Sequence, residues 1–245
     1  MSHPDPLGPQ LPLALRYPPD QRLETWLDVS AGGIPGRLAL LATGESRDPV
    51  LLQGANGTGK THLLLATCAA AEAVGRSARY VALARLRGHA RIAFEGLEHA
   101  DLVAVDGVDE IAGSRDDEVA LFDLHNRVRD AGASLLYAAR HTPASLPLTL
   151  PDLRSRLAQC TLASLPSLDD DGRAEVLRQR AASRGLAFDA AALDWLLTRC
   201  SRDLSDLAAM FERLDRASLA AQRRITVPFL RQVLGTEGGC AEVAV

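Results

Sequence analysis

Residues 50–61 read VLLQGANGTGKT, and this stretch decides the fold. It begins with a short apolar run typical of a buried β-strand, and residues 54–61 fit the pattern GxxxxGK[ST] in full. The residues that follow carry the apolar spacing of a helix. A strand, a glycine-rich loop and a helix in this order are the context in which the pattern binds phosphate, so we predict a phosphate-binding loop.

Each part of this loop has a defined chemistry in nucleotide binding. Glycines let successive backbone N–H groups point at a phosphate, and the N-terminus of the following helix adds a positive dipole. Lys60 is expected to bridge the terminal phosphates and Thr61 to bind Mg²⁺. A glycine-rich turn without a ligand is the alternative, but it does not require strand, helix and full pattern together. The predicted cofactor-binding residues of the loop are Gly54, Ala55, Asn56, Gly57, Thr58, Gly59, Lys60 and Thr61.

Lys60 is the only lysine among the 27 lysine and arginine residues of the chain. Genomic base composition is sufficient to explain the preference for arginine elsewhere. A lysine retained against that preference indicates a position that needs a compact ammonium group on a flexible stem, which the planar guanidinium of arginine does not imitate. The composition therefore points to the same loop.

The overall composition is that of a globular protein. The chain has 245 residues, of which 47% are hydrophobic and 24% charged, enough for one main domain and a small second one. A net charge of -4 argues against a protein that coats nucleic acid by bulk electrostatics, although it is compatible with a local basic face. Any contact with DNA is therefore expected to be local or indirect.

The sequence contains neither a membrane span nor a secretion signal, since no apolar run approaches about 18 residues and residues 1–10 lack a basic start. The cysteines are widely spaced, which favours reduced, buried thiols over a zinc site or disulfides. We expect a cytoplasmic protein that makes no membrane contact. The four cysteines are Cys68, Cys160, Cys200 and Cys240.

Short apolar runs alternate with amphipathic segments along residues 21–166, a pattern typical of βα units around a parallel sheet. We therefore predict an α/β fold with helices on both faces of a parallel sheet. Strands are expected at residues 50–53, 79–83, 102–105 and 134–138, with another near 160–165, and helices at 61–74 and 118–129.

After Pro166 the pattern becomes helical only. Ser167 followed by Asp170 resembles a capping box that opens a helix, and Gly185 is a stop signal for it. Further helices are expected at 189–200, 203–221 and 226–234. The predicted domains are an extended proline-rich arm at 1–20, a nucleotide-binding α/β domain at 21–166, a small helical lid at 167–235 and a flexible tail at 236–245.

Asp106 follows four apolar residues of a predicted strand. Proteins with a phosphate-binding loop position Mg²⁺ with an acidic residue at the end of a neighbouring strand, so we predict Asp106 and Thr61 as the Mg²⁺ site. Hydrolytic members usually have a water-polarising glutamate at the next position, which is Gly107 here. Because Asp109 and Glu110 come only two and three residues after Gly107, the sequence supports nucleotide binding better than hydrolysis.

With these residues the chain resembles the initiator clade of the AAA+ superfamily, which contains DnaA, and within it the Hda family of regulatory inactivators of DnaA. The resemblance covers nearly the whole length and implies an AAA+ domain with a helical lid. Beyond the two nucleotide-binding segments, it rests on LFDLHNRV at 121–128, LPDLRSRL at 150–157, LDRAS at 214–218 and TVPF at 226–229.

The resemblance implies roles for two arginines. Arg156 corresponds to the arginine finger, which reaches a nucleotide held by a neighbouring subunit and stabilises phosphoryl-transfer charge there. Arg202 corresponds to the second sensor arginine of the lid and would contact the bound nucleotide. Without the family, an ordinary surface ion pair is the simpler interpretation of Arg156.

The chain departs from the family at the first sensor, where Ala139 and Arg140 replace a small polar or acidic residue. Together with Gly107, this departure predicts weak intrinsic ATPase activity at most. Nucleotide binding is not affected by it, and the resemblance implies ADP, or ATP, as the bound cofactor.

Residues 10–15 read QLPLAL and are similar to the sliding-clamp-binding peptide QL[S/P]LPL of the Hda family, departing only at Ala14. An extended arm can present leucines to an apolar pocket on a partner while a glutamine bonds at the rim. The alternative is that these leucines pack on the protein's own core. Their place in a proline-rich arm favours the clamp. The predicted partner-binding residues are Gln10, Leu11, Leu13 and Leu15.

These features predict a nucleotide-dependent regulator of replication initiation that is associated with the nucleoid or replisome. It would link the DNA polymerase III beta sliding clamp to DnaA and stimulate hydrolysis of DnaA-bound ATP, which prevents over-initiation. DNA would be contacted mainly through the clamp, and the sequence is compatible with a homo-oligomer. DnaA continues past its lid into a helix-turn-helix domain, whereas only residues 235–245 follow Leu234 here, so sequence-specific origin binding is not expected.

Two other functions stay open at this point. The chain could be an ATP-driven remodelling ATPase or a helicase loader of the DnaC type, which would turn over ATP robustly. It could also anchor an initiator-like protein, with the nucleotide serving only a structural purpose.

Overall fold

A computed structural model of the chain describes the sheet domain almost completely and the helical region in part. The described residues are 22–26, 33–183, 185–186, 188–199, 210, 213–214, 216–217 and 224–235. Predictions that concern residues 10–15, Arg202, Cys200 or Cys240 lie outside the described residues.

Five parallel strands form the sheet, in the order β2-β3-β4-β1-β5. Because all strands run the same way, their carboxyl ends meet at one edge, where α/β folds place their ligands. The predicted strands are confirmed, with boundaries that move by one residue, as in β2. The strands are β1 (Val50–Gln53), β2 (Ala78–Ala82), β3 (Leu102–Asp106), β4 (Ser134–Ala139) and β5 (Thr161–Ser164).

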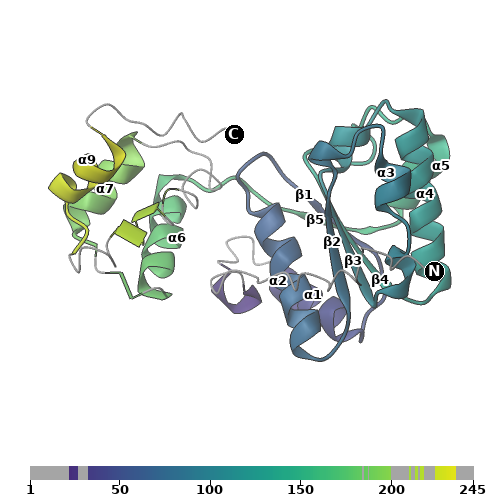
Figure 1. Ribbon diagram of the computed structural model, residues 1–245, viewed down its shortest axis with the longest axis horizontal. Coiled ribbons are helices and arrows are strands. Elements are labelled where there is room, and N and C mark those ends of the chain that lie inside the picture. Colours follow the sequence, from purple (N-terminus) through teal and green to yellow (C-terminus); the bar gives the residue numbers. More distant parts are fainter. Residues whose placement is uncertain are drawn as a thin grey trace, which may run out of the picture.

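Helices cover both faces of the sheet, as predicted (Figure 1). All six residues of β4 are buried, which is expected for a central strand covered on both sides. Side chains from alternate positions of the strands enter two separate apolar clusters, one on each face. One face is covered by α1 (Ile34–Thr43) and α2 (Lys60–Ala73), and the other by α3 (Ala90–Ala93), α4 (Arg115–Asp130) and α5 (Pro151–Ala158).

Helix α4 shows why the local sequence forms a helix. It buries Leu121, Leu124 and Val128, which recur at the spacing of one helical face. Acidic residues occupy its first turn and Arg127 and Arg129 its last, an arrangement that complements the helix dipole. The helix begins three residues before the predicted start at Glu118, because its acidic first turn carries no apolar spacing signal.

Three helices of the sheet domain were not predicted from apolar spacing: α1, the single-turn α3, and α5. Both α1 and α5 have a proline in the first turn, Pro35 and Pro151, where its fixed φ suits a helix and its missing N–H costs no hydrogen bond. The short 3₁₀ segments of the domain are η1 (Leu23–Thr25), η2 (Leu83–Arg85), η3 (Leu97–His99) and η4 (Val108–Ile111).

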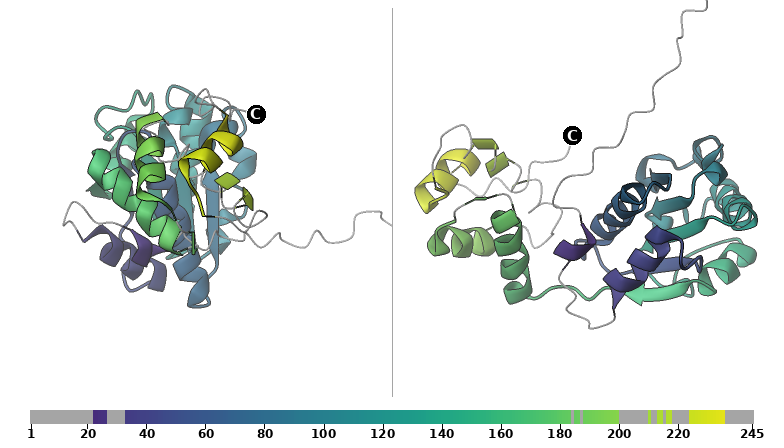
Figure 2. Two further views of the ribbon diagram at one scale, coloured as in Figure 1. Left: turned by 90° about the vertical axis from the view of Figure 1, so that its left-hand side faces the viewer. Right: turned by 90° about the horizontal axis from the view of Figure 1, so that it is seen from below.

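A helical region follows the sheet domain and stands apart from it in Figure 1 and in the right-hand view of Figure 2. Its helices pack around their own apolar cluster, which includes Leu177, Leu196 and Leu230. An isolated parallel bridge between Phe188 and Ile225, not predicted, joins two of its connections. The described helices are α6 (Asp170–Ser183), α7 (Ala190–Arg199) and α9 (Val227–Leu234).

The predicted capping box at the start of α6 is wrong. The side chain that accepts from the free N–H groups is Asp169, whose Oδ1 lies 2.8 Å from the Gly172 N. Asp169 directly precedes the first helical residue, so its carboxylate reaches the third N–H of the helix, whereas Ser167 lies two residues too early.

None of the helices in the described parts of the chain is long and apolar enough to cross a membrane. Cys68 and Cys160 are buried free thiols. Burial raises the pKa of each thiol to about 12, which makes them unreactive and agrees with the prediction of reduced, buried cysteines.

Candidate functional site

The glycine-rich loop joins the end of β1 to the start of α2 at the carboxyl edge of the sheet. The Gly54 N donates to the Ala139 O of β4 at 3.2 Å, which places the start of the loop beside the central strand. A Cβ at Gly54 would lie 2.6 Å from the Thr58 Oγ1 and 2.7 Å from the Leu165 O. The loop backbone is therefore packed too closely for a side chain here, as expected of a cradle for phosphate.

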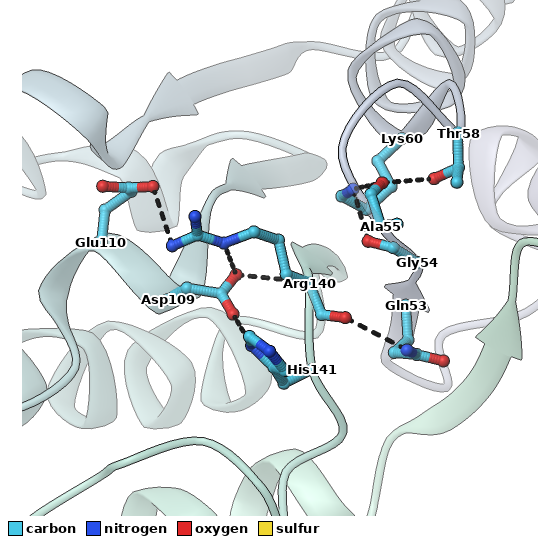
Figure 3. Close-up of polar contacts among 9 residues, drawn as sticks. All are labelled: Gln53, Gly54, Ala55, Thr58, Lys60, Asp109, Glu110, Arg140 and His141. Atoms are coloured by element: carbon cyan, nitrogen blue, oxygen red, sulfur yellow. Dashed lines mark hydrogen bonds and ion pairs between the residues drawn. The ribbon is translucent and has the colours of Figure 1, made fainter. Parts of the chain in front are cut away.

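Lys60 turns its ammonium group into the mouth of the loop (Figure 3). Its Nζ donates to the Gly54 O and to the Ala55 O, both at 2.7 Å. The Thr58 Oγ1 donates to the same Ala55 O at 3.0 Å and closes the turn. A cation enclosed by backbone in this way fits an anionic ligand of phosphate size.

The two predicted Mg²⁺ residues lie against each other. The Thr61 Oγ1 donates to the Asp106 Oδ2 at 2.6 Å, across the gap between α2 and β3. The Tyr80 OH, from β2, donates to the same oxygen at 2.9 Å. Burial, and then the charge of Asp106, raise the pKa of Tyr80, so the phenol stays a donor.

Oxygen ligands of this kind suit Mg²⁺, which is usually bound through one or two protein groups together with substrate phosphates and water. The described residues contain no group of three or more His, Cys, Asp or Glu side chains that could hold a metal by themselves. Thr61 and Asp106 would therefore hold Mg²⁺ only together with a bound nucleotide.

Trp26 was not predicted to be part of this site. Its indole lies over the loop, and a Cβ at Gly59 would come within 2.4 Å of the ring. The ring also packs beside His62 of α2, with centroids 5.8 Å apart. Gly59 has a φ of +86°, so it combines a left-handed backbone with close contact to an aromatic ring.

Gly59→Ala is expected to destabilise the protein by about 1–3 kcal/mol, from the left-handed backbone plus displacement of Trp26. Urea unfolding measures this loss. Gly75→Ala is the matched control, because Gly75 has a φ of +78° but nothing within 4 Å of the added Cβ. Equal losses for the two variants would show that contact with Trp26 contributes nothing.

The position where hydrolytic relatives carry a glutamate has a backbone that disfavours any side chain. Gly107 has a φ of +80°, and its N donates to the Ala138 O at 3.0 Å. A Cβ there would also lie 3.3 Å from the Glu110 Cγ. The turn after Asp106 is thus shaped around a glycine.

Arg140 is part of an ion-pair network that was not predicted. Its backbone N donates to the Asp109 Oδ2 at 2.6 Å, and its guanidinium lies 3.8 Å from Asp109 and 3.3 Å from Glu110 (Figure 3). The His141 Nδ1 lies 3.0 Å from the Asp109 Oδ1. The signal was present in the sequence as two acidic residues after β3 and two basic ones after β4, strands that turn out to be neighbours.

Arg156 lies on α5 with its side chain exposed. Within the described residues its guanidinium has no hydrogen bond or ion pair, whereas Arg154 on the same helix donates to the Leu148 O at 2.6 Å. The two arginines of α5 therefore differ: Arg154 is bonded to the fold, and Arg156 is presented to solvent. The charge of Arg156 is also felt by His125 on α4: burial lowers the pKa of His125 to about 4, and the positive charge of Arg156 acts in the same direction.

Glu118 positions the helix that carries Arg156. This fully buried carboxylate accepts from the Gly113 N at 2.7 Å, from both the N and the Oγ1 of Thr149, and from the Leu150 N at 2.7 Å. Its pKa is lowered, because the hydrogen bonds to the charged form outweigh burial. The start of α5 is thereby tied to the start of α4.

A family model for the Hda lid domain matches residues 170–234. This match falls on the helices that follow the five-stranded parallel sheet and its glycine-rich loop. The chain therefore resembles Hda in its lid, and its fold resembles that of the AAA+ domain of DnaA.

Solved structures agree on the AAA+ fold. Domain III of the replication initiation protein DnaA from Thermotoga maritima matches with a TM-score of 0.69 and 18% identity, over 89% of this chain and 97% of that chain. DnaA bound to AMPPCP and single-stranded DNA matches with a TM-score of 0.66 and 18% identity, over 85% and 70%.

A Holliday junction branch migration motor shares the same architecture. RuvB from Thermotoga maritima has a TM-score of 0.56 and 17% identity, over 84% of this chain and 71% of that chain. At such identities the likeness shows the fold alone, and the function of this chain has to be argued from its site.

Proposed function

We propose that this AAA+ protein is a nucleotide-dependent regulator of replication initiation. It links the DNA polymerase III beta sliding clamp to DnaA and stimulates hydrolysis of DnaA-bound ATP, which limits over-initiation. The observation that carries this proposal is Arg156, an exposed guanidinium on a rigidly held helix, in a chain whose lid resembles that of Hda.

The loop and its neighbours would bind the nucleotide. Backbone N–H groups of the loop and the start of α2 would hold the β-phosphate, and Lys60 would neutralise its charge. Thr61 and Asp106 would hold Mg²⁺, which supplies further charge neutralisation when bound. Arg202, outside the described residues, would complete the site from the lid. ADP is the proposed functional ligand.

The same site favours binding a nucleotide over hydrolysing it. A glutamate that polarises water is missing at Gly107, where the left-handed backbone disfavours one. The next strand ends in Ala139, whose side chain has no polar atom, and the side chain of Arg140 is paired with carboxylates. These observations weigh against an ATP-driven remodeller or DnaC-like loader, which has to turn over its own ATP.

Arg156 would act in trans, on the nucleotide of DnaA. An arginine finger needs a guanidinium that is free to enter a partner's site yet fixed in position. Glu118 supplies the fixed position by holding Thr149 and Leu150, the two residues just before α5, and exposure leaves the guanidinium accessible. Arg154 does not meet the requirement, because it is bonded to the Leu148 O.

The clamp would be bound by residues 10–15, with Gln10 at the rim of a pocket and Leu11, Leu13 and Leu15 inside it. This part of the proposal rests on the peptide sequence QLPLAL. Binding to a clamp that is loaded on DNA would place the protein at the replisome in the cytoplasm.

The test is a reconstituted reaction. DnaA is loaded with labelled ATP and mixed with the full-length chain, ADP and clamp on primed DNA. The expected result is faster loss of ATP from DnaA, and only when clamp, DNA and the chain are all present. Loss of ATP at DnaA's own rate in the complete mixture would overturn the proposed function.

A further inference from the structure

Four charged side chains form a network at the carboxyl edge of the sheet that the proposed function does not use. Arg140 and His141 follow β4, and Asp109 and Glu110 belong to η4. The network thus connects the tip of the central strand with the turn after Asp106 (Figure 3).

Within this network the main chain of Arg140 is held firmly. Its N donates to the Asp109 Oδ2 at 2.6 Å, and its O accepts from the Gln53 Nε2 at 3.1 Å. The Asp109 side chain is only 4% exposed, so its hydrogen bond to the main chain is shielded from water. The residue is fixed from β1 on one side and from η4 on the other.

The guanidinium of Arg140 is held much more loosely. Its Nε lies 3.8 Å from the Asp109 Oδ2, and its Nη2 lies 3.3 Å from the Glu110 Oε1. The side chains of Arg140 and Glu110 are both 41% exposed. Ion pairs of solvent-exposed side chains contribute little stability, so a phosphate that accepts two charge-assisted hydrogen bonds is able to displace them.

The position of Arg140 is next to the phosphate loop. Strand β4 lies between β3, which ends in Asp106, and β1, from which the loop starts. The Gly54 N donates to the Ala139 O, and Lys60 donates to the Gly54 O, so the main chain that leads into Arg140 lies beside the stretch of backbone that holds Lys60. The guanidinium of Arg140 points towards Glu110 and away from Lys60 (Figure 3). Arg140 has two carboxylates beside it, so its charge becomes available to a ligand only when these ion pairs break.

We propose that Arg140 is a specificity-determining ligand for the terminal phosphate of a nucleoside triphosphate, and that Glu110 and Asp109 compete with that phosphate for its guanidinium. The proposal rests on the proposed nucleotide binding by the loop. A triphosphate has to break the ion pairs of Arg140, whereas a diphosphate leaves them intact. The network therefore shifts the preference of the site towards the diphosphate.

Two substitutions at one ion pair should then have opposite effects. Glu110→Gln removes a competing charge and releases Arg140, so triphosphate binding becomes tighter. Arg140→Ala removes the ligand itself, so triphosphate binding becomes weaker. A diphosphate is bound by the loop and Lys60, so its affinity changes little in either variant.

The experiment is equilibrium binding of ADP and of a non-hydrolysable ATP analogue to the full-length chain. For the analogue we expect Glu110→Gln to raise affinity about 3–10-fold and Arg140→Ala to lower it about tenfold, with ADP within about twofold. The double variant should show no gain over Arg140→Ala. Arg140→Lys, which keeps the charge without the planar fork, should fall between wild type and Arg140→Ala.

An ion pair in the lid offers matched controls. The Arg178 Nη1 lies 3.1 Å from the Glu175 Oε2, and both side chains are exposed at similar levels to Arg140 and Glu110. Glu175→Gln and Arg178→Ala should change neither affinity. Unfolding midpoints of all variants identify any loss of folding, and Glu110→Gln is informative even if Arg140→Ala unfolds.

Two results would overturn the inference. One is an equal change for ADP and the triphosphate analogue, which indicates a structural role for Arg140. The other is a gain in Glu110→Gln that persists in the double variant, which indicates that Glu110 acts without Arg140. Binding of neither nucleotide by the wild type would instead defeat the proposed function, so the two failures are distinguishable.

Discussion

Replacement of Lys60 by alanine is expected to lower nucleotide affinity about 100-fold or more, which corresponds to about 2.8 kcal/mol. The ammonium group lies inside the loop, bonded to the Gly54 O and the Ala55 O. It is thus already at the place where phosphate charge accumulates, and no other lysine exists to replace it. Equilibrium titration with labelled ADP measures the loss.

Lys60→Arg sharpens this prediction. The guanidinium is planar and broader than an ammonium, so it cannot enter the narrow mouth between two backbone carbonyls. We expect it to bind nucleotide almost as poorly as Lys60→Ala. Arg91→Ala, at an exposed position on α3, should bind normally. Normal ADP affinity in Lys60→Arg would show that charge alone suffices and that the retained lysine carries no special information.

Replacement of Arg156 by alanine is expected to abolish the stimulation of ATP hydrolysis on DnaA. Arginine fingers accelerate phosphoryl transfer about 10³–10⁵-fold, so the rate should fall to that of DnaA alone. Single-turnover loss of labelled ATP from DnaA, with clamp on DNA present, gives this rate. The variant should keep its own nucleotide and its clamp binding, because Arg156 lies on α5 and the loop begins beside β4.

Arg37→Ala is the control for Arg156→Ala. Arg37 is also exposed, but it lies on α1, on the opposite face of the sheet from α5. It should stimulate DnaA like the wild type. Equal loss in the two variants, or full stimulation by Arg156→Ala, would remove Arg156 from the mechanism. Arg154→Ala is unsuitable as a control, since it breaks the bond that fixes α5.

The parts of the fold that could be predicted are those with a local signal. Each strand is an apolar run, and the loop is set by its glycines and Lys60, so residues 50–61 identify the site without knowledge of the sheet. Helices α1 and α5 were missed because Pro35 and Pro151 look like loop residues, although both suit a first helical turn.

The parts that could not be predicted depend on which strands are neighbours. The pairing of Arg140 with Asp109 follows from the adjacency of β3 and β4, and the order of parallel strands has no signature in a single sequence. The contact of Trp26 with Gly59 likewise joins distant parts of the chain. Gly107 was identified as a departure, but only its φ of +80° explains why the backbone favours glycine there.

The proposed site binds a nucleotide without hydrolysing it, while the nucleotide on DnaA is hydrolysed. The loop, Lys60, Thr61 and Asp106 provide the binding. Groups that could activate water are missing, because Gly107 stands where a glutamate is usual and the side chain of Arg140 is paired with carboxylates. In the proposed function the bound nucleotide serves as a switch, and Arg156 acts on the nucleotide of DnaA.

The most direct measurement compares two mixtures, both with clamp on DNA. In the first, DnaA carries labelled ATP and the full-length chain carries ADP; in the second, the chain carries labelled ATP. The account predicts rapid loss of the ATP on DnaA in the first mixture, while the ATP on the chain in the second persists over many such lifetimes. Rapid hydrolysis of the chain's own ATP, with DnaA's ATP unchanged, would contradict it and would favour a remodelling ATPase or helicase loader.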